Sequence, residues 1–207
     1  MPNKNRNAVS RVPETITLDE ANKIMALLNE TKNTRVGQVK AVRNRALFLL
    51  MLDAGLRIGE VVGLKANSLW LLDQAVDSVN LDPDFAEKGC VRTIPLTPRL
   101  KSAIIELHDS YWPFYRIDGT SPAFCGKNKT DSIGQRQIQR IIKAVSLQAI
   151  GREIWPHVLR HTFASRLMRT SPVSVVQRLL GHKQISSSQV YMHPNGDDLA
   201  SAIKSLT

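Results

Sequence analysis

The sequence ALFLLMLDAGLRIGE, residues 46–60, joins the longest apolar run of the chain to a glycine turn signal. After its first turn, the segment Ala41–Asp53 is apolar almost all round, which predicts a helix buried on every side. Gly55 is well placed to end that helix, because glycine readily adopts the left-handed conformation found at helix C-termini. A second, short helix is expected from about Arg57 to Lys65. The stretch therefore predicts two helices that meet at a tight turn.

The chain before this stretch carries one clear helix signal. Thr17 is followed three residues later by Glu20, a capping-box pattern that predicts a helix through about Asn29. Residues 1–13 are expected to form a flexible basic arm, and residues 31–40 a polar loop.

After this stretch, the pattern of apolar residues changes between Trp70 and Leu96. Short apolar pieces are separated there by Asp, Asn and the turn signal at 82–84, which predicts a small antiparallel sheet of two or three strands. Helix is expected again from Thr97 or Pro98 to about Ser110, followed by a loop over 111–122 and a short strand at 123–125. Further helices are expected over 134–150, 156–169, 172–180 and 186–191, with an amphipathic stretch over 197–206. The predicted fold class is mostly α with a small antiparallel β-sheet (α+β).

The charge of the chain points to an anionic partner. The 207 residues carry a formal net charge of +10, and a charge this far from zero favours nucleic acid as that partner, with a merely soluble basic protein as the alternative. Aromatic residues make up only 5% of the chain, which disfavours a stacking platform for single strands. Duplex DNA held through its phosphates fits better.

Several classes of protein are disfavoured by composition. No apolar run approaches the length of a membrane span, and the N-terminus lacks the apolar segment of a secretory signal, so we expect a cytoplasmic protein. Cys90 and Cys125 fit neither a disulfide framework nor a metal-ligand spacing, and are interpreted as reduced structural thiols.

The first candidate site residue is Arg57, two residues after Gly55. At the start of a helix, a guanidinium lies beside backbone N–H groups that also favour an anion. Glu60 lies on the same face and can orient Arg57 or pair with another cation. The alternative for Arg57 and Glu60 is an ordinary surface ion pair.

The second candidate is the stretch HVLRHTF, residues 157–163, which follows the first-turn residue Pro156. Helical spacing places His157, Arg160 and His161 on one face. Histidines four residues apart invite a zinc interpretation, but a metalloprotease motif requires Glu where this chain has Val158. A basic face that binds an oxyanion is the better interpretation, and no metal is expected.

The third candidate is the stretch LLGHKQISSSQVY, residues 179–191. His182 follows a helix that Gly181 can cap, and such a histidine usually only stabilises the helix C-terminus. Tyr191 comes nine residues later, after a run rich in Ser and Gln, and taken alone it is an ordinary surface tyrosine.

Together, and in this order, the three stretches resemble the catalytic domain of the tyrosine recombinases, the phage-integrase family. The family's pattern is an Arg after Gly-Leu with an acidic residue three positions on, then His-x-x-Arg-His, then Leu-Gly-His, then a Tyr about nine residues later. The resemblance covers roughly residues 15–195. It implies a helical domain with a small antiparallel sheet, in agreement with the pattern of the chain.

The resemblance also implies a role for each matching residue. Arg57 and Arg160 match the two phosphate-binding arginines, and Tyr191 matches the nucleophile. His157 and His182 match the positions that handle protons or bond the phosphate, with His161 and Glu60 in supporting positions. The implied product is a 3′-phosphotyrosyl link, formed without metal, ATP or any other cofactor.

The family also uses a lysine on a turn of its sheet. Between Ala66 and Leu100 the chain has one lysine, Lys88, in the stretch EKGCVRTIP. Lys88 is therefore expected to be the general acid for the leaving 5′ oxygen. The turn departs from the family's usual glycine pattern, because Glu87 precedes the lysine; Glu87 would either raise the lysine's pKa or be its salt-bridge partner.

The resemblance implies a site-specific DNA recombinase that performs integration, inversion or plasmid-dimer resolution. A type IB-like topoisomerase and a non-catalytic DNA-binding regulator of the same fold are the alternatives. The implied partners are duplex DNA, further copies of the chain in a tetramer on DNA, and accessory DNA-bending proteins, with a monomer in free solution left open and the nucleoid as the location. Arg136, Arg140 and Lys143 on the 134–150 helix are candidates for DNA contact or a solvated basic face.

The expected organisation is an arm (1–13), a catalytic domain (14–195) and a tail helix (196–207). The tail would dock on a neighbouring protomer or pack on its own chain. Most members of the family carry a separate N-terminal DNA-clamping domain, so the sequence is expected to be either a naturally short recombinase or a fragment.

Overall fold

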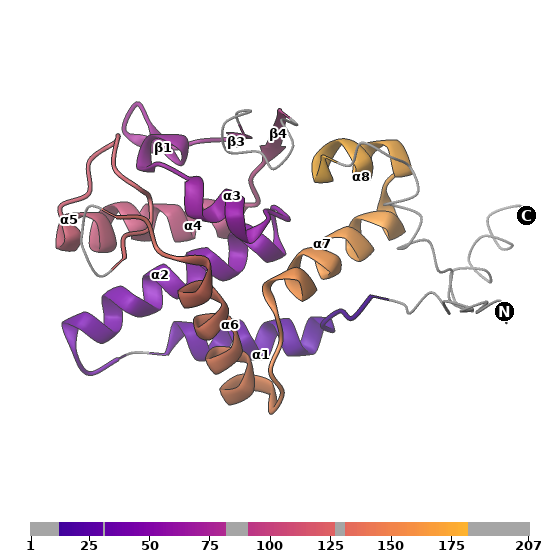
Figure 1. The fold of residues 1–207 in the computed structure, drawn as a ribbon, viewed down its shortest axis with the longest axis horizontal. Helices are drawn as coiled ribbons and strands as arrows, with labels where there is room; N and C mark the ends of the chain where they lie inside the picture. Colours follow the sequence, from indigo (N-terminus) through magenta and orange to yellow (C-terminus); the bar gives the residue numbers. More distant parts are fainter. Residues whose placement is uncertain (1–12, 31, 82–90, 127–130, 182–207) are drawn as a thin grey trace, which may run out of the picture.

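The computed structural model describes residues 13–30, 32–81, 91–126 and 131–181, which form a helical body with two small antiparallel sheets at one edge (Figure 1). The predicted fold class is confirmed. The predicted arm over 1–13, apart from Pro13, and the elements expected at 186–191 and 197–206 lie outside the described residues.

Helix α1, Leu18–Asn29, begins with the predicted capping box. The hydroxyl of Thr17 accepts a hydrogen bond from the backbone N–H of Glu20 at 3.1 Å, and the Glu20 carboxylate accepts one from the backbone N–H of Thr17 at 2.8 Å. These reciprocal bonds satisfy two N–H groups that the helix itself leaves without a partner.

Helix α2, Arg35–Leu52, begins six residues before the predicted start at Ala41. Thr34 caps it by accepting a hydrogen bond from the backbone N–H of Gly37 at 3.1 Å. The expected polar loop over 31–40 is therefore wrong in its second half, because a local N-cap outweighs the polar composition of the first turns.

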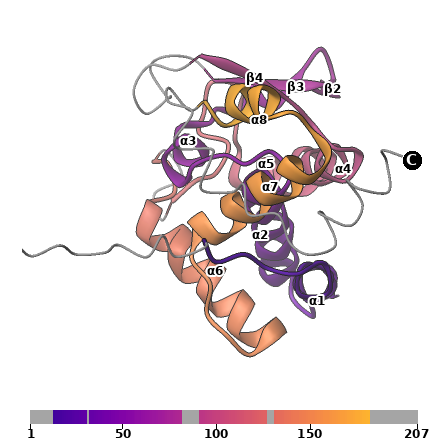
Figure 2. The same cartoon turned by 90° about the vertical axis from the view of Figure 1, so that its right-hand side faces the viewer.

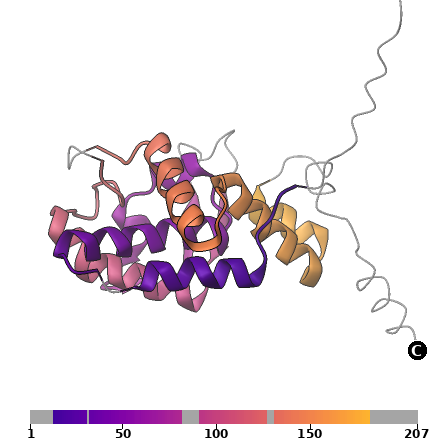
Figure 3. The same ribbon diagram turned by 90° about the horizontal axis from the view of Figure 1, so that it is seen from below.

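The second half of α2 is the centre of the molecule. Every residue from Ala46 to Leu52 is at most 2% exposed, as the apolar run predicted. The helix packs against α1, α4 (Pro98–Glu106), α6 (Gln135–Ile150) and α7 (Pro156–Thr170). Figure 2 shows α2 between these helices, and Figure 3 shows α6 crossing α1 on the side seen from below.

The predicted single sheet is two separate two-stranded sheets. Strand β1 (Trp70–Leu71) pairs antiparallel with β2 (Gln74–Ala75), and β3 (Ser78–Leu81) pairs antiparallel with β4 (Arg92–Pro95). The register of the second pair places Leu81 opposite Arg92. A 3₁₀ turn, η1 (Ala66–Ser68), precedes β1.

The predicted loop over 111–122 is wrong at its start. Helix α4 continues through the π-helical segment η2 (Leu107–Tyr111) and α5 (Trp112–Tyr115), and ends at Arg116 in the left-handed conformation. Burial explains the extension: Trp112 is only 4% exposed, and its indole N–H donates to the carbonyl oxygen of Ala123 at 3.0 Å. Ala123–Cys125 forms an isolated bridge from Cys125 to Ser132 rather than a strand.

Four predicted helices fall close to their expected bounds: α3 (Ile58–Gly63), α6, α7 and α8 (Val173–Leu180). Helix α8 packs on α7 and on strand β4. Its C-cap is Gly181, in the left-handed conformation expected of it, at φ +64°. Among the described residues, no helix is long and apolar enough to cross a membrane.

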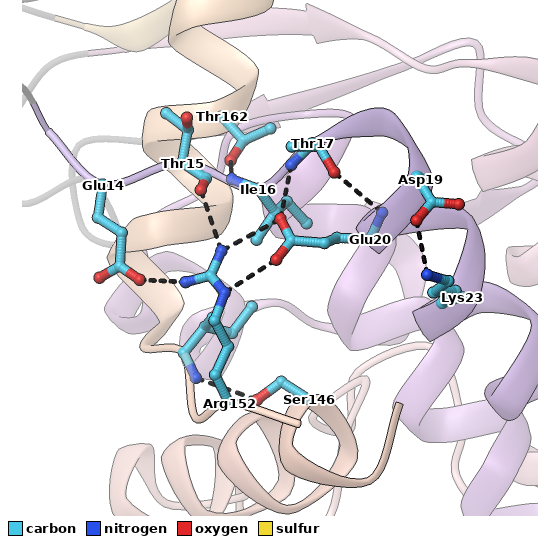
Figure 4. Close-up of polar contacts among 11 residues, drawn as sticks. Glu14, Thr15, Ile16, Thr17, Asp19, Glu20, Lys23, Ser146, Arg152 and Thr162 are labelled. Carbon is cyan, nitrogen blue, oxygen red and sulfur yellow. Dashed lines mark hydrogen bonds and ion pairs between the residues drawn. The ribbon is translucent and has the colours of Figure 1, made fainter. Parts of the chain in front are cut away.

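Arg152 fastens the segment before α1 to the connection between α6 and α7 (Figure 4). Its Nε and Nη2 donate to the two carboxylate oxygens of Glu20, at 2.9 and 3.1 Å. It also donates to the carbonyl oxygen of Thr15 at 3.3 Å and pairs with Glu14. One guanidinium thus joins three positions of the N-terminal segment to the body of the molecule.

Candidate active site

The turn after α2 places Arg57 at the start of α3. Gly55 has φ +62°, and the backbone N–H of Leu56 donates to the carbonyl oxygen of Leu50 at 3.1 Å. The ring of Phe163 lies where a side chain at residue 55 would begin, since a Cβ built on Gly55 would be 2.2 Å from its Cδ1. Only glycine fits both the backbone conformation and this close approach.

Arg57 is held by Glu60. The backbone N–H of Arg57 donates to Glu60 Oε2 at 2.7 Å, and its Nη1 donates to Glu60 Oε1 at 3.1 Å. The Glu60 side chain is completely buried, whereas the Arg57 side chain is 25% exposed. The pair is therefore an arginine at the surface anchored to a carboxylate in the interior, and the interpretation as an ordinary surface ion pair is wrong.

Arg92, on β4, is the second cation that binds Glu60. Its Nη1 and Nη2 donate to the two oxygens of the Glu60 carboxylate at 2.8 and 2.7 Å, and its Nε donates to the carbonyl oxygen of Leu179 at 2.9 Å. Arg92 was not among the predicted site residues. Its strand alternation carried the signal, because Arg92 has the same parity as Ile94 and Leu96, and all three are buried.

Glu60 is ionised in this environment. Burial alone would raise its pKa, but the hydrogen bonds and charge of Arg92, the backbone N–H of Arg57 and the charge of Arg160 hold the pKa of Glu60 below its usual value. The carboxylate therefore remains a fixed negative charge between Arg57 and Arg92 over the ordinary pH range.

Arg160 lies on α7 and is only 8% exposed. Its Nη1 donates to the carbonyl oxygen of Gly55, and its Nη2 donates to the carbonyl oxygen of Leu180 at 2.7 Å. Arg160 thus joins the turn that carries Arg57 to the end of α8. The structure brings Arg57, Glu60 and Arg160 together, as the sequence motifs predicted, although they are up to 103 residues apart in the chain.

The two histidines of α7 differ in exposure. His157 is exposed and His161 is partly buried, with their ring centroids 5.4 Å apart and their planes inclined at 62°. Burial, and then the nearby charges of His157 and Arg160, lower the pKa of His161 below the ordinary value. His161 is therefore mainly neutral at pH 7. Within the described residues, no group of three or more His, Cys, Asp or Glu side chains is arranged to hold a metal ion.

Three predicted site residues lie outside the described residues: Lys88, His182 and Tyr191. The described structure resumes at Val91, next to Arg92, on one side and ends at Gly181 on the other. A Cβ on Gly181 would be 3.0 Å from Arg92 Nη1. Gly181, the last described residue before His182, therefore lies against the side chain of Arg92, one residue after the described chain resumes beyond Lys88.

The three candidate DNA-contact residues of α6 are not equivalent. Arg136 and Arg140 are exposed and lie one turn apart. Lys143 instead donates to Glu153 at 2.6 Å and lies 4.0 Å from the centre of the Trp155 ring. The start of α6 adjoins α3, since a Cβ on Gly59 would be 3.5 Å from Gln135 Nε2. Of the three, Arg136 and Arg140 keep the more accessible charges.

Most of the chain matches a known protein family and curated relatives. The model of the phage integrase family matches residues 14–197. Tyrosine recombinase XerC of Neisseria gonorrhoeae is 33% identical over 193 residues, which cover 92% of this chain and 58% of the relative. Tyrosine recombinase XerD of Lacticaseibacillus casei is 30% identical over 193 residues, which cover 91% of this chain and 61% of the relative. The chain thus spans about three fifths of the length of these relatives.

Solved structures share the fold. The crystal structure of XerA recombinase superposes with a TM-score of 0.73 at 22% identity, covering 99% of this chain and 66% of XerA. XerH site-specific recombinase, in a post-cleavage complex with a palindromic difH substrate, gives a TM-score of 0.75 at 20% identity, covering 96% of this chain and 55% of XerH.

Proposed function

Since the chain belongs to the phage integrase family, we propose that this protein is a site-specific recombinase that cuts and rejoins duplex DNA through a phosphotyrosyl link at Tyr191. The observation that carries the proposal is the joining of Arg57 and Arg160 around one turn, with Glu60 behind them. Residues 14–195 would act as the catalytic domain. The relatives XerC and XerD carry the name tyrosine recombinase, and XerH is described in complex with its difH substrate.

The proposed chemistry is an in-line attack of the Tyr191 phenolate oxygen on one phosphorus atom of the DNA backbone. The P–O5′ bond breaks as the tyrosine–phosphorus bond forms, and the 5′ oxygen leaves as a hydroxyl after taking a proton from Lys88. Arg57 and Arg160 stabilise the charge on the equatorial oxygens, which is the largest expected contribution. His157 and His182 assist with protons and hydrogen bonds, with His161 in support. Attack by a second 5′ hydroxyl reverses these steps and reseals the strand.

The proposed partners follow from the same chemistry. Duplex DNA is the substrate, with Arg136 and Arg140 among the groups that contact its backbone. Two duplexes that exchange strands require several active sites at once, so we propose a tetramer of this chain on DNA.

Covalent trapping tests the proposed function. Sequencing the DNA that flanks the gene identifies inverted or direct repeats, which supply candidate target duplexes. A duplex nicked close to the scissile phosphate releases a short fragment and leaves the protein linked to the 3′ end. We expect a covalent adduct, and mass spectrometry should locate it on the peptide that contains Tyr191. Absence of an adduct on every candidate duplex contradicts the proposal, and an adduct elsewhere contradicts the choice of nucleophile.

The same substrates separate a recombinase from a topoisomerase. We expect Holliday junctions from two duplexes that carry the site. Relaxation of supercoiled DNA in the absence of any junction would instead identify a type IB-like topoisomerase.

Replacing Lys88 with alanine should slow strand cleavage by about 10²-fold, because a general acid typically contributes this much or more. Binding to the duplex should change little, since many other cations share the phosphate contacts. A substrate with a 5′-thiol leaving group, which needs no proton, should restore the cleavage rate. Failure of this rescue would assign the general acid to another residue.

A further inference from the structure

Five hydrogen-bonded links form a closed ring that includes the two predicted phosphate-binding arginines. Arg57 bonds Glu60, and Glu60 bonds Arg92. Arg92 bonds the carbonyl oxygen of Leu179 in α8, and the next carbonyl, that of Leu180, accepts from Arg160. Arg160 also bonds the carbonyl of Gly55, two residues before Arg57. The ring thus joins β4, α3, α7 and α8.

Arg92 is the member of this ring that has been given no role so far, although it lies in the stretch EKGCVRTIP with Lys88. Its side chain is 2% exposed and that of Glu60 is not exposed at all. The planar guanidinium contacts both carboxylate oxygens and still directs Nε at the helix end, a geometry that the single ammonium of lysine does not reproduce. Gly181 packs directly against it, because a Cβ there would lie 3.2 Å from Arg92 Cδ.

We propose that Arg92 is a positioning residue for DNA cleavage. Its hydrogen bonds keep the Glu60 carboxylate where it contacts Arg57. Arg92 also fixes the last turn of α8, in which the carbonyl oxygen of Leu180 accepts from Arg160 and orients it. In this way it sets the separation of the two guanidiniums that bind one phosphate. The proposal rests on the recombinase function, because it concerns the geometry of that site.

A structural role alone is a weaker explanation for Arg92. A buried ion pair often stabilises a fold no better than apolar residues of the same volume, because both charges lose their hydration. The bidentate contact between Arg92 and Glu60 does fix the orientation of the Glu60 carboxylate. Displacing a catalytic group by about 1 Å can cost about 10²-fold in rate.

Arg152 offers a matched control within the same chain. Like Arg92, it contacts both oxygens of one glutamate, Glu20, and one backbone carbonyl, that of Thr15 (Figure 4). It is more exposed, at 36% of its side chain, and it bonds neither Arg57 nor Arg160 in the described structure. Arg152→Lys therefore repeats the chemical change without touching the ring.

The test compares Arg92→Lys with Arg152→Lys in the full chain. At saturating nicked duplex, we expect Arg92→Lys to cleave about 10- to 100-fold more slowly, with duplex affinity within about threefold of the original. Arg152→Lys should keep the cleavage rate within about twofold. A loss confined to binding, an unchanged cleavage rate, or an equal loss in Arg152→Lys would overturn the proposal.

Hydrogen exchange without DNA gives a second measurement that does not depend on cleavage. Arg92→Lys should speed exchange of backbone amides in 57–61 and 176–181 by about tenfold, because it loosens both contacts of the ring. Arg152→Lys should affect residues 15–21 instead. If the unsubstituted protein makes no adduct, the recombinase function fails while the exchange result still decides whether Arg92 orders both segments. Unchanged exchange in both segments overturns the positioning role.

Arg92→Met is a second variant that keeps the proposal testable if Arg92→Lys fails to fold. It keeps most of the side-chain length, removes the charge and should cleave more slowly than Arg92→Lys. Unfolding of both variants, judged by circular dichroism at the assay temperature, would assign Arg92 to stability alone and overturn the proposal.

Discussion

Replacing Arg160 with alanine is expected to slow strand cleavage by at least about 10³-fold. The guanidinium provides charge and hydrogen bonds that matter most when the attacked phosphate carries its extra negative charge. Duplex affinity should fall by less than about tenfold, because a chain with a net charge of +10 contacts DNA through many cations. Single-turnover cleavage and a binding titration at fixed salt measure the two effects separately.

The structure adds a stability cost to this variant. Alanine at residue 160 removes the bonds to the carbonyls of Gly55 and Leu180, and we expect a loss of about 2 kcal/mol in the free energy of unfolding. Arg160→Lys is the control, because it keeps the charge but cannot bridge both carbonyls as a fork does. We expect Arg160→Lys to bind DNA normally and to cleave slowly. Equal losses of binding and cleavage in Arg160→Ala would contradict the assigned role.

Gly55→Ala is expected to have the largest effect on stability. The residue has φ +62°, which costs a side chain about 1–2 kcal/mol, and the new methyl group would lie 2.2 Å from Phe163 Cδ1 and 2.6 Å from its Cε1. Displacing a buried ring typically costs about 1–3 kcal/mol more. We expect a total loss of about 2–5 kcal/mol in the free energy of unfolding, measured by urea unfolding.

Gly151→Ala separates the two causes. Gly151 also has a positive φ, +73°, but apart from local backbone and chain neighbours no heavy atom of the described residues lies within 4 Å of a Cβ built there. Only the backbone cost should appear, so its loss should be about 1–2 kcal/mol. The double variant Gly55→Ala with Phe163→Ala should lose less than the sum of the single changes, because the small side chain removes the clash. Equal effects of the two glycine substitutions would refute the role of Phe163.

The sequence predicted the parts of the fold that local patterns determine. The run from Ala46 to Leu52 was correctly expected to be buried on all sides, and the capping box at Thr17 correctly placed the start of α1. The start of α2 was missed, because one hydroxyl at Thr34 outweighs a polar composition. The helix through Tyr111 to Tyr115 was missed as well, because its burial depends on partners elsewhere in the chain, such as Ala123.

In the candidate site, too, local motifs were predicted correctly and contacts that depend on distant residues were missed. The motifs correctly brought Arg57 and Glu60 together with Arg160. They gave no sign that Arg160 faces inward towards two carbonyls, since helical spacing had placed it on a shared face with the exposed His157. Arg92 was missed because a charged residue beside a turn is ordinarily solvated; its burial requires Glu60, 32 residues away in the chain.

The end of α8 has a mechanical consequence. Its last carbonyls are covered by Arg92 and Arg160. Unwinding this turn would cost both bonds at once, about 1–3 kcal/mol for each buried group. Gly181, at φ +64°, closes this turn, since its backbone N–H donates to the carbonyl oxygen of Arg178 at 3.4 Å. The last turn of α8 should therefore resist fraying more than a helix end whose carbonyls face water.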